Sequence, residues 1–436
     1  MEVNSTPRES SVLNGEAMWG SNRKRQSVWD GLLWISLYTF AFLLPFENIL
    51  GRVGLGFLGG VKILGLLIAG GLVLKVLGDP RGLGVQVKNL LAPISLSGLL
   101  FTIWCLMSAF WAPNPTWALL RVSTYVGLFV VMQAIGLLKR EDIKRMWELL
   151  LLGAALSVPL GLILPAPTEV VAASGRFTSG GQDPNDYANL IVVTVGVVFY
   201  GILTCKREVR GKLLRIVLLS SALVAVMAIP LSLSRTAVIN LLAMLLASSL
   251  LRRTAKSATK LVVLMGLVLL CIVVLFPDFT DRMVQRYSTL QWLQQEATWA
   301  GRIDIWRAAV TVFAERPFTG VGAGNFAFVS PYYSYYAALI AATREDGGGG
   351  VVHNMFLSVM SETGVIGLIL FGALLLSAYA SARRLVRRGE SLGYGLLIGL
   401  LAYTVAGLTL TWEYVKIPYV LYGSLLALRT EDARHA

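Results

Sequence analysis

The sequence Gly347-Gly348-Gly349-Gly350-Val351-Val352-His353-Asn354 closes the one long polar interruption in an otherwise apolar chain. The interruption runs from Pro277 to Val352, and a new apolar segment follows it. The chain has only 2 histidines, and the other one, His435, lies next to the C-terminus. Histidine is the side chain whose ordinary pKa lies nearest to neutrality. His353 is therefore the first candidate for any acid-base chemistry near neutral pH.

The composition outside this stretch decides the fold class. The chain is 56% hydrophobic and 14% charged, whereas soluble domains are about one quarter charged. Apolar runs of about 20 residues, long enough to cross a bilayer, recur along the whole length. These runs are continuous and do not alternate with period two, which excludes a transmembrane β-barrel. We predict an all-α polytopic membrane protein.

The apolar runs predict about twelve transmembrane helices, which divide the chain into five parts. The predicted spans are 29–46, 57–77, 90–111, 116–138, 147–165, 186–204, 213–231, 235–251, 260–277, 353–378, 391–410 and 412–428. The predicted parts are an N-terminal tail (1–28), helices one to nine (29–277), a polar loop (278–352), helices ten to twelve (353–428) and a C-terminal tail (429–436).

Every second connection between these spans is rich in lysine and arginine. Examples are Lys139-Arg140 and the arginines Arg383, Arg384, Arg387 and Arg388, whereas the connections between them hold single cations. The positive-inside rule then places both termini in the cytoplasm and the polar loop on the outer side. The net charge of +13 follows from this topology, so we expect no nucleic-acid partner.

The remaining cations lie on the predicted outer face or within about two helical turns of it. They include Lys62, Arg121, Arg176 and Arg235. A cation inside the hydrocarbon edge costs a few kcal/mol unless its side chain snorkels or finds a partner. Snorkelling to headgroups explains Lys62 or Arg121 taken alone. Taken together, the outer cations resemble the lining of an anion-binding cavity.

The positions of the acidic residues along the sequence favour an enzyme over a transporter. No Asp or Glu is expected near the centre of any span, so the carboxylates of a proton relay are missing. Matching pairs of helices broken by Gly or Pro, typical of transporters, are missing as well. The cysteines, Cys105, Cys205 and Cys271, show no CxxC spacing, and we interpret them as packing residues.

Two short outer connections carry further candidates. Ser174 to Asp186 is a turn-rich loop in which Asp183, Asn185 or Asp186 is suited to cap the next helix. The two acids of this loop are also carboxylates that a metal ion could bind, which is the alternative interpretation. In Ser232-Leu233-Ser234-Arg235-Thr236, Arg235 begins a helix, where the dipole disfavours a cation. Arg235 therefore needs an anionic partner, either a structural one or a ligand phosphate.

Within the polar loop, residues 299–314 predict an amphipathic helix lying on the membrane surface. Ile303, Trp306, Val310 and Phe313 form its apolar face, and Arg302 projects together with Trp306. The run Gly320-Val321-Gly322-Ala323-Gly324-Asn325 lacks the lysine of a phosphate loop, so we interpret it as backbone close to a ligand or as a tight turn. Four tyrosines follow, which predict an interfacial anchor or a sugar-stacking surface. They are Tyr332, Tyr333, Tyr335 and Tyr336.

The spacing His353-Asn354, nine residues, Gly364, two residues, Gly367 resembles the signature of the O-antigen ligases. The order of the elements also matches: many spans, an outer arginine (Arg235), a large periplasmic loop with a helical arginine (Arg302) and then the histidine. The wider superfamily includes the Wzy-type O-antigen polymerases and the bacterial O-oligosaccharyltransferases. The resemblance covers residues 170–375, and it implies a fold similar to the membrane domains of C-type glycosyltransferases.

The resemblance implies transfer of an O-antigen chain from undecaprenyl diphosphate to a sugar hydroxyl of lipid A-core, at the periplasmic face of a bacterial inner membrane. A histidine near its ordinary pKa of about 6.5 suits the role of base, so we assign that role to His353. Arginine forks suit a diphosphate, so Arg235 and Arg302 are assigned as catalytic. Substrate binding is assigned to a second set of residues: Arg121, Arg176, Lys62, Asn354 and Trp306. We expect no metal and no cofactor, and an inverting single displacement.

Three alternatives stay open. An O-antigen polymerase or an O-linked protein oligosaccharyltransferase would use similar residues. A polysaccharide flippase or exporter would need basic lining on both faces across the midplane, which the sequence lacks. Gly364 and Gly367 are expected to be structural, because small residues allow helices to pack closely.

Overall fold

The computed structural model describes a helical chain. The described residues are 31–46, 60–78, 84, 87–163, 176–179, 183–205, 209, 211–251, 255–275, 281 and 297–435, and their regular structure is entirely helical. The predicted N-terminal tail, most of residues 276–296 and part of the loop 174–186 lie outside this set. The side chain of Lys62 also lies outside it, although its backbone belongs to a helix.

The described part of the first half of the chain is built from these main helical segments. They are an unlabelled helix Gly31–Leu43, η1 (Leu44–Phe46), α3 (Gly60–Gly78), α5 (Pro93–Met107) with η2 (Ser108–Phe110), α6 (Pro115–Ile135), α7 (Arg140–Ile163), and α9 (Pro184–Val198) continued by the π-helix η3 (Phe199–Leu203).

The second half supplies the remaining helices. They are α10 (Lys212–Leu231), α11 (Arg235–Leu250), α12 (Ala255–Leu275), α14 (Ala297–Glu315), α15 (Phe326–Val329) with η5 (Ser330–Tyr332), α16 (Tyr335–Thr343), α17 (Met355–Arg387), α18 (Ser391–Gly407) and α19 (Lys416–His435).

A helix lies at each of the twelve intervals predicted to cross the membrane. Six described helices are long and apolar enough to do so, namely Pro93–Phe110, Pro115–Ile135, Arg140–Ile163, Pro184–Leu203, Lys212–Leu231 and Met355–Arg387. The chain is thus an all-helical, multi-pass membrane protein, and the number of spans stays a prediction. Several boundaries differ from expectation, and α7 already begins at Arg140 instead of at residue 147. The helix α17 continues to Arg387 because arginine is a good helix former, and α19 begins only at Lys416.

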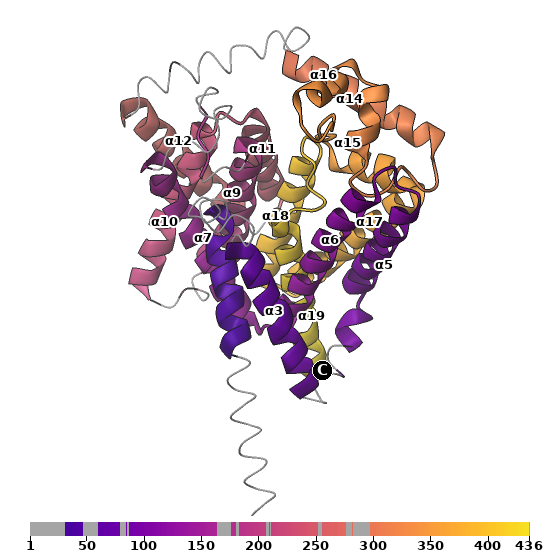
Figure 1. Cartoon of the computed structure of the whole chain (residues 1–436). Coiled ribbons are helices and arrows are strands. Elements are labelled where there is room, and N and C mark those ends of the chain that lie inside the picture. Colours follow the sequence, from indigo (N-terminus) through magenta and orange to yellow (C-terminus); the bar gives the residue numbers. More distant parts are fainter. Residues whose placement is uncertain are drawn as a thin grey trace, which may run out of the picture.

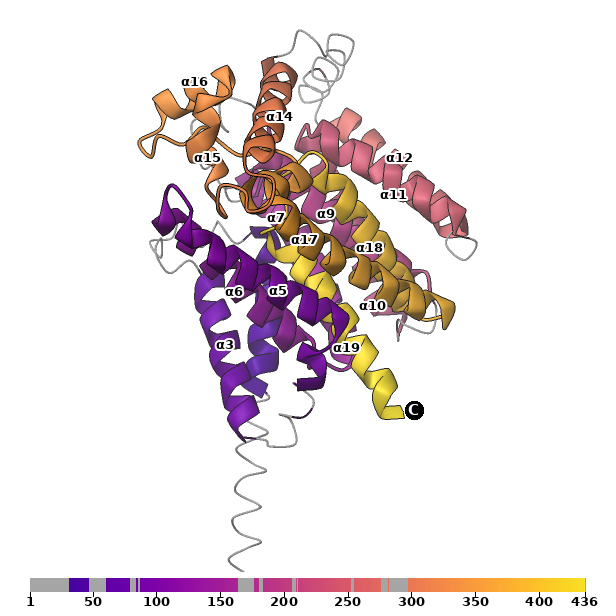
Figure 2. The same cartoon turned by 90° about the vertical axis from the view of Figure 1, so that its right-hand side faces the viewer.

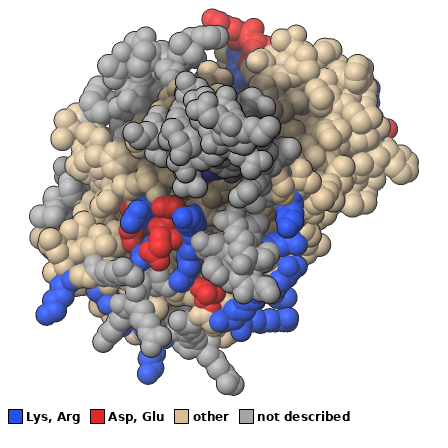
Figure 3. Space-filling view, turned by 90° about the horizontal axis from the view of Figure 1, so that it is seen from below, with Lys and Arg blue, Asp and Glu red and all other residues tan. Residues whose placement is uncertain are grey.

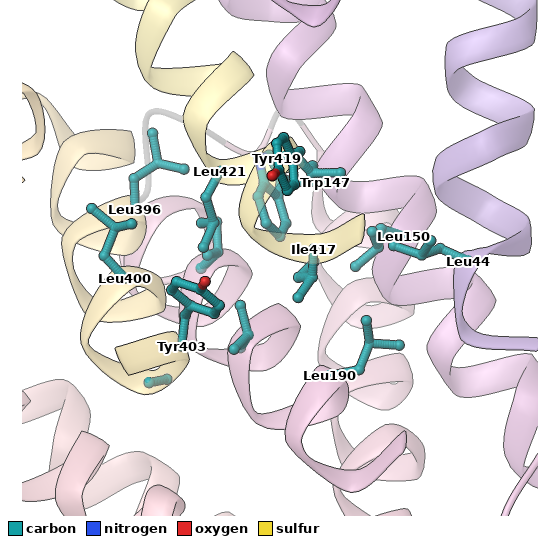
Figure 4. Close-up of a cluster of buried hydrophobic side chains, with 14 of the residues drawn as sticks. Leu44, Trp147, Leu150, Leu190, Leu396, Leu400, Tyr403, Ile417, Tyr419 and Leu421 are labelled. Carbon is teal, nitrogen blue, oxygen red and sulfur yellow. The ribbon is translucent and has the colours of Figure 1, made fainter. Parts of the chain in front are cut away.

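The central helix of the bundle is α9, which packs against α7, α10, α11 and α18. In its most apolar window, 94% of the residues are buried, so α9 is surrounded by protein and not by lipid. Figure 4 shows part of the adjoining core, which includes Trp147 of α7, Tyr403 of α18 and Tyr419 of α19. Between membrane helices, close van der Waals packing of such side chains, together with hydrogen bonds between helices, holds the bundle together.

Short polar residues fix where the helices begin. Asn114 caps α6, with Pro115 as the first helical residue, and Asp183 caps α9, with Pro184 in the same position. The carboxylate of Asp183 accepts hydrogen bonds from the backbone N–H groups of Asn185 (2.7 Å) and Asp186 (3.4 Å). The capping role predicted for this loop is therefore confirmed for Asp183.

The two ends of the bundle differ in structure. Helices α14, α15 and α16 lie at the end opposite to the C-terminus in both views (Figure 1, Figure 2). The face at the C-terminal end, seen from below, carries clusters of Lys and Arg beside a few acids (Figure 3). Two basic connections meet in an ion pair, because Arg140 Nη2 lies 3.0 Å from a carboxylate oxygen of Glu390. Assignment of this face to the cytoplasm stays a prediction.

Candidate functional site

His353 lies in the connection between α16 and α17 with an unusual backbone. Its φ of 57° belongs to the left-handed region, which a non-glycine residue rarely adopts. Two hydrogen bonds hold this conformation from both sides. The N–H of His353 donates to Thr411 Oγ1 (2.9 Å), and Trp306 Nε1 donates to the carbonyl of Val352 (2.9 Å). A strained residue persists only where its surroundings over-determine it, so the structure fixes the position of this histidine firmly.

Burial and charged neighbours together shift the pKa of His353, which precedes α17. Partial burial lowers its pKa first, the positive charge of Arg302 lowers it further and Asp183 opposes them, giving a pKa of about 4. The expectation of an ordinary pKa near 6.5 was therefore wrong. The physical reason is that burial and a nearby cation both disfavour the imidazolium. At neutral pH the imidazole is uncharged and able to accept a proton.

The helix α14 brings Arg302 and Trp306 to this site. Its buried stripe consists of Ile305, Ala308, Ala309 and Val312, which pack against Val321, Phe326 and Val352. The predicted apolar face is different, since Ile303 and Val310 are 43% and 50% exposed. Thus α14 packs on the protein with one stripe and presents the predicted stripe outward. Trp306, between the two, bonds the backbone before His353.

Asn354 uses its side chain within the protein. It caps α17, because Oδ1 accepts from the N–H groups of Phe356 (3.0 Å) and Leu357 (3.1 Å). Its Nδ2 donates to the carbonyl of Leu408 (3.0 Å). This geometry favours capping over the predicted contact with substrate.

A second group of predicted residues gathers where the loop before α9 meets the turn before α11. Asn185 Oδ1 accepts from Arg176 Nη2 (2.8 Å) and from Ser234 Oγ (2.9 Å). Arg176 Nε also donates to the carbonyl of Ser232 (3.0 Å). Arg235, the next residue of that turn, is only 8% exposed at the start of α11. The structure therefore joins Arg176 and the turn carrying Arg235 through one amide.

This network continues into the bundle. Asn189 Nδ2 donates to Thr236 Oγ1 (3.2 Å), and Asn240 Nδ2 donates to Asn189 Oδ1 (2.8 Å). All three side chains are buried. Buried polar groups are stable only when they are hydrogen-bonded, so the network ties the start of α11 to α9 rigidly.

Four consecutive residues between α18 and α19 each contact a different part of this region. Thr411 binds the N–H of His353. Trp412 Nε1 donates to Asp186 Oδ1 (2.8 Å), and Glu413 Oε1 accepts from Ser358 Oγ of α17 (2.7 Å). The ring of Tyr414 stacks on the guanidinium of Arg121, 3.5 Å away. No role in the site was predicted for these four residues, which lie between and at the start of the predicted spans 391–410 and 412–428; their polar and aromatic side chains were the available signal.

Arg121 belongs to a separate buried cluster. The acidic residues that act on it are Glu362 and Glu413, and its Nη1 is buried and has no hydrogen-bond partner among the described residues. The side chain of Arg121 is therefore held within the protein and does not reach toward lipid headgroups. Glu362 also corrects the expectation that no acid lies near the centre of a span, because it stands near the middle of the predicted interval 353–378 and is buried.

The glycine run 320–325 encloses Glu362 and packs against α17. The N–H of Gly322 donates to the carbonyl of Glu362 (2.8 Å), and the N–H of Gly324 donates to Glu362 Oε2 (2.7 Å). Gly320, Gly322 and Gly324 all have positive φ. Of the two interpretations of this run, the structure favours the tight turn.

Gly364 kinks α17 beside this turn. Its φ of 67° and ψ of −169° are not helical, and the N–H of Val365 donates to the carbonyl of Pro317 instead (2.8 Å). A side chain at Gly364 would clash with the backbone of Phe318, and one at Gly367 with Thr363. The spacing of His353 to these glycines therefore has a physical meaning: Gly364 lets the polar loop pack closely on the helix that follows the histidine, and Gly367 leaves room for Thr363 and for Trp104 of α5.

The comparisons with known proteins agree with this arrangement. Residues 220–372 match the family model Wzy_C, described as O-antigen ligase. No curated protein matches the chain. The matched segment contains Arg235, Arg302, His353 and both motif glycines. The match supports glycosyl transfer of the ligase or polymerase type, with a lipid-linked polysaccharide as donor. The resemblance to the O-antigen ligase and Wzy superfamily is thus confirmed over residues 220–372.

Proposed function

We propose that the protein transfers O-antigen polysaccharide from undecaprenyl diphosphate to a sugar hydroxyl of lipid A-core, at the periplasmic face of the inner membrane. The observation that carries the proposal is the approach of α14 to His353 within the segment matching the O-antigen ligase family, where Trp306 Nε1 donates to the carbonyl of Val352 (2.9 Å) and the charge of Arg302 acts on the imidazole. A neutral base beside a fixed cation is the pair that this reaction requires.

The base acts on the acceptor. A sugar hydroxyl is a poor nucleophile, and positioned proton removal contributes on the order of 10² to 10⁴ in rate. In one displacement, the hydroxyl oxygen bonds to the anomeric carbon while the bond from that carbon to the diphosphate oxygen breaks. The hydroxyl proton passes to a ring nitrogen of His353, and the bonding electron pair leaves with the diphosphate. The configuration at the anomeric carbon inverts.

The arginines act on the leaving group. As the sugar departs, negative charge grows on the diphosphate, and guanidinium groups bind such oxygens in pairs of hydrogen bonds worth about 1.5–3 kcal/mol each. Arg302 and Arg235 are assigned to this role, with Arg176 linked through Asn185 to Ser234 in the turn before Arg235. Arg121 is assigned to the buried cluster that it forms with Glu362 and Glu413. Lys62 and Trp306 stay predicted substrate contacts. With this charge neutralised by side chains, we propose that transfer proceeds without a metal ion.

An approaching diphosphate also adjusts the base. The positive charge of Arg302 holds the pKa of His353 down. A bound anion would offset that charge, so the imidazole becomes a stronger base once donor is present. Donor binding and base activation are then linked through one arginine.

The test is transfer by the purified protein in detergent, with a diphosphate-linked glycan as donor and chelator present. Glycan appearing on lipid A-core supports a ligase. Extension of the diphosphate-linked glycan itself, without modification of lipid A-core, would assign a polymerase and overturn the ligase proposal. Transfer to a protein acceptor alone would assign an O-oligosaccharyltransferase. Loss of all activity on chelation would contradict the metal-independent scheme.

A further inference from the structure

A groove on α17 lies far from the candidate site. It has a volume of about 320 Å³ and is lined by Leu376, Tyr379, Ala380, Arg383, Arg384 and Arg387. These positions recur every three or four residues, so they share one face of the helix over three turns. At 1.5 Å per residue, the groove lies roughly 30–50 Å along α17 from His353. It is therefore a separate site, beyond the proposed transfer reaction.

The groove is apolar at one end and basic at the other. Leu376 is 71% exposed, and Ala380 follows it one turn later on the same face. Three arginines then occupy the last two turns, and none of them forms an ion pair with a carboxylate in the described part of the chain. The groove thus offers an apolar surface and three guanidinium groups in one line.

Residues next to the groove hold its lining side chains in place and add to its positive charge. Tyr379 OH donates to the carbonyl of Leu400 (3.0 Å) and shares a hydrogen bond with Thr404 Oγ1 (2.8 Å), which holds the ring against α18. Arg384 acts electrostatically on Arg429 of α19. The Nη1 atom of Arg429 is buried, with no hydrogen-bond partner among the described residues. The guanidinium groups of Arg384 and Arg429 carry like charges and repel each other, so an anion bound between them would be stabilised.

We propose that this groove binds an anionic phospholipid, with its phosphodiester on Arg383, Arg384 and Arg387 and an acyl chain along Leu376 and Ala380. Charge complementarity and the order of the lining residues carry the assignment. Basic pockets between transmembrane helices are suited to anionic headgroups, and guanidinium groups bind phosphate oxygens through paired hydrogen bonds. A free phosphate would use the arginines but leave the apolar end unfilled.

The experiment is native mass spectrometry of the full chain in detergent, titrated separately with phosphatidylglycerol, phosphatidylcholine and inorganic phosphate. We expect wild type to retain one phosphatidylglycerol at least about tenfold more tightly than phosphatidylcholine. Arg384→Gln combined with Arg387→Gln should weaken that retention by about tenfold or more. Size-exclusion chromatography and thermal unfolding establish that each variant is folded.

The matched control is Arg388→Gln, an exposed arginine of the same cluster that does not line the groove. It should change retention by less than about threefold. Equal retention of the two lipids would overturn the proposal, and so would equal losses in the groove variant and the Arg388 variant. Inorganic phosphate that displaces phosphatidylglycerol at equal concentration would assign a free-phosphate site instead.

Discussion

The backbone N–H of His353 donates to Thr411 Oγ1 across 2.9 Å, which joins the start of α17 to the last connection of the chain. The contact holds a histidine whose φ of 57° is unfavourable for its residue type. Thr411 lies 58 residues further along the chain. The two residues meet only because α18 returns to the end of the bundle where α17 begins.

Thr411→Val should reduce kcat by about 10- to 100-fold with little change in KM, because a misplaced base loses rate before it loses substrate binding. Thr411→Ser keeps the acceptor oxygen and should restore most of kcat. Thr409→Val is the control, since Thr409 Oγ1 bonds within its own turn, to the carbonyl of Ala406. Steady-state kinetics of the purified variants measure this. Equal kcat in the Val and Ser variants would show that the hydrogen bond does not position His353.

Arg302→Gln should shift the pH dependence of kcat/KM. In wild type, His353 has a pKa of about 4, so its base form is complete from about pH 5 upward and kcat/KM should be flat between pH 5 and 7.5. Arg302 disfavours the imidazolium, so its removal should raise the pKa of His353 above about 4, while burial, the larger cause, still holds that pKa below its ordinary value. The variant should therefore begin to lose activity at a higher pH than wild type as the pH falls.

The control for this pH profile is Arg307→Gln, an exposed arginine on the same helix. Its profile should remain that of wild type, with uniformly small changes in rate. An acid limb at the same pH in wild type and in Arg302→Gln would contradict the electrostatic role of Arg302.

Asn185→Leu should raise KM for the diphosphate donor by about tenfold, because it removes the shared acceptor of Arg176 and Ser234. Both the outer arginine and the turn before Arg235 would lose a fixed position. Asn185→Asp keeps the accepting oxygen and should retain a KM near that of wild type. If Leu and Asp variants bind donor equally well, the network is structural and does not organise the arginines.

Gly364→Ala should lower the free energy of unfolding by about 2 kcal/mol or more, because a methyl group there meets the backbone of Phe318 and φ is 67°. Gly372→Ala lies on the same helix with nothing within 4 Å of the added atom. It should leave stability unchanged or raise it by up to about 1 kcal/mol. Thermal unfolding in detergent compares the two. Equal melting temperatures would remove the structural reason for the motif glycine.

Much of the fold was predictable because apolar length and capping residues are local signals. The apolar runs located helices at all twelve intervals, and the polar start of α9 was predicted to contain its cap. The end of α17 was not predicted, because arginines continue a helix beyond the apolar stretch that hydropathy detects.

The candidate site was predictable only in part. The spacing around His353 identified the histidine, and the helical pattern of α14 paired Arg302 with Trp306. Contacts between residues far apart in the chain were out of reach, such as Thr411 with His353 and Tyr414 with Arg121. The lowered pKa of His353 was also missed, since burial and the approach of Arg302 arise only in the folded chain.

The most direct test of the central claim is the rate of glycan transfer by purified His353→Ala, with donor binding measured separately. We expect the rate to fall by about 10²- to 10⁴-fold while the donor still binds, because the arginines remain. His435→Ala, which removes the chain's other histidine, should transfer at the wild-type rate. Transfer by folded His353→Ala at the wild-type rate would contradict the assignment of His353 as the base.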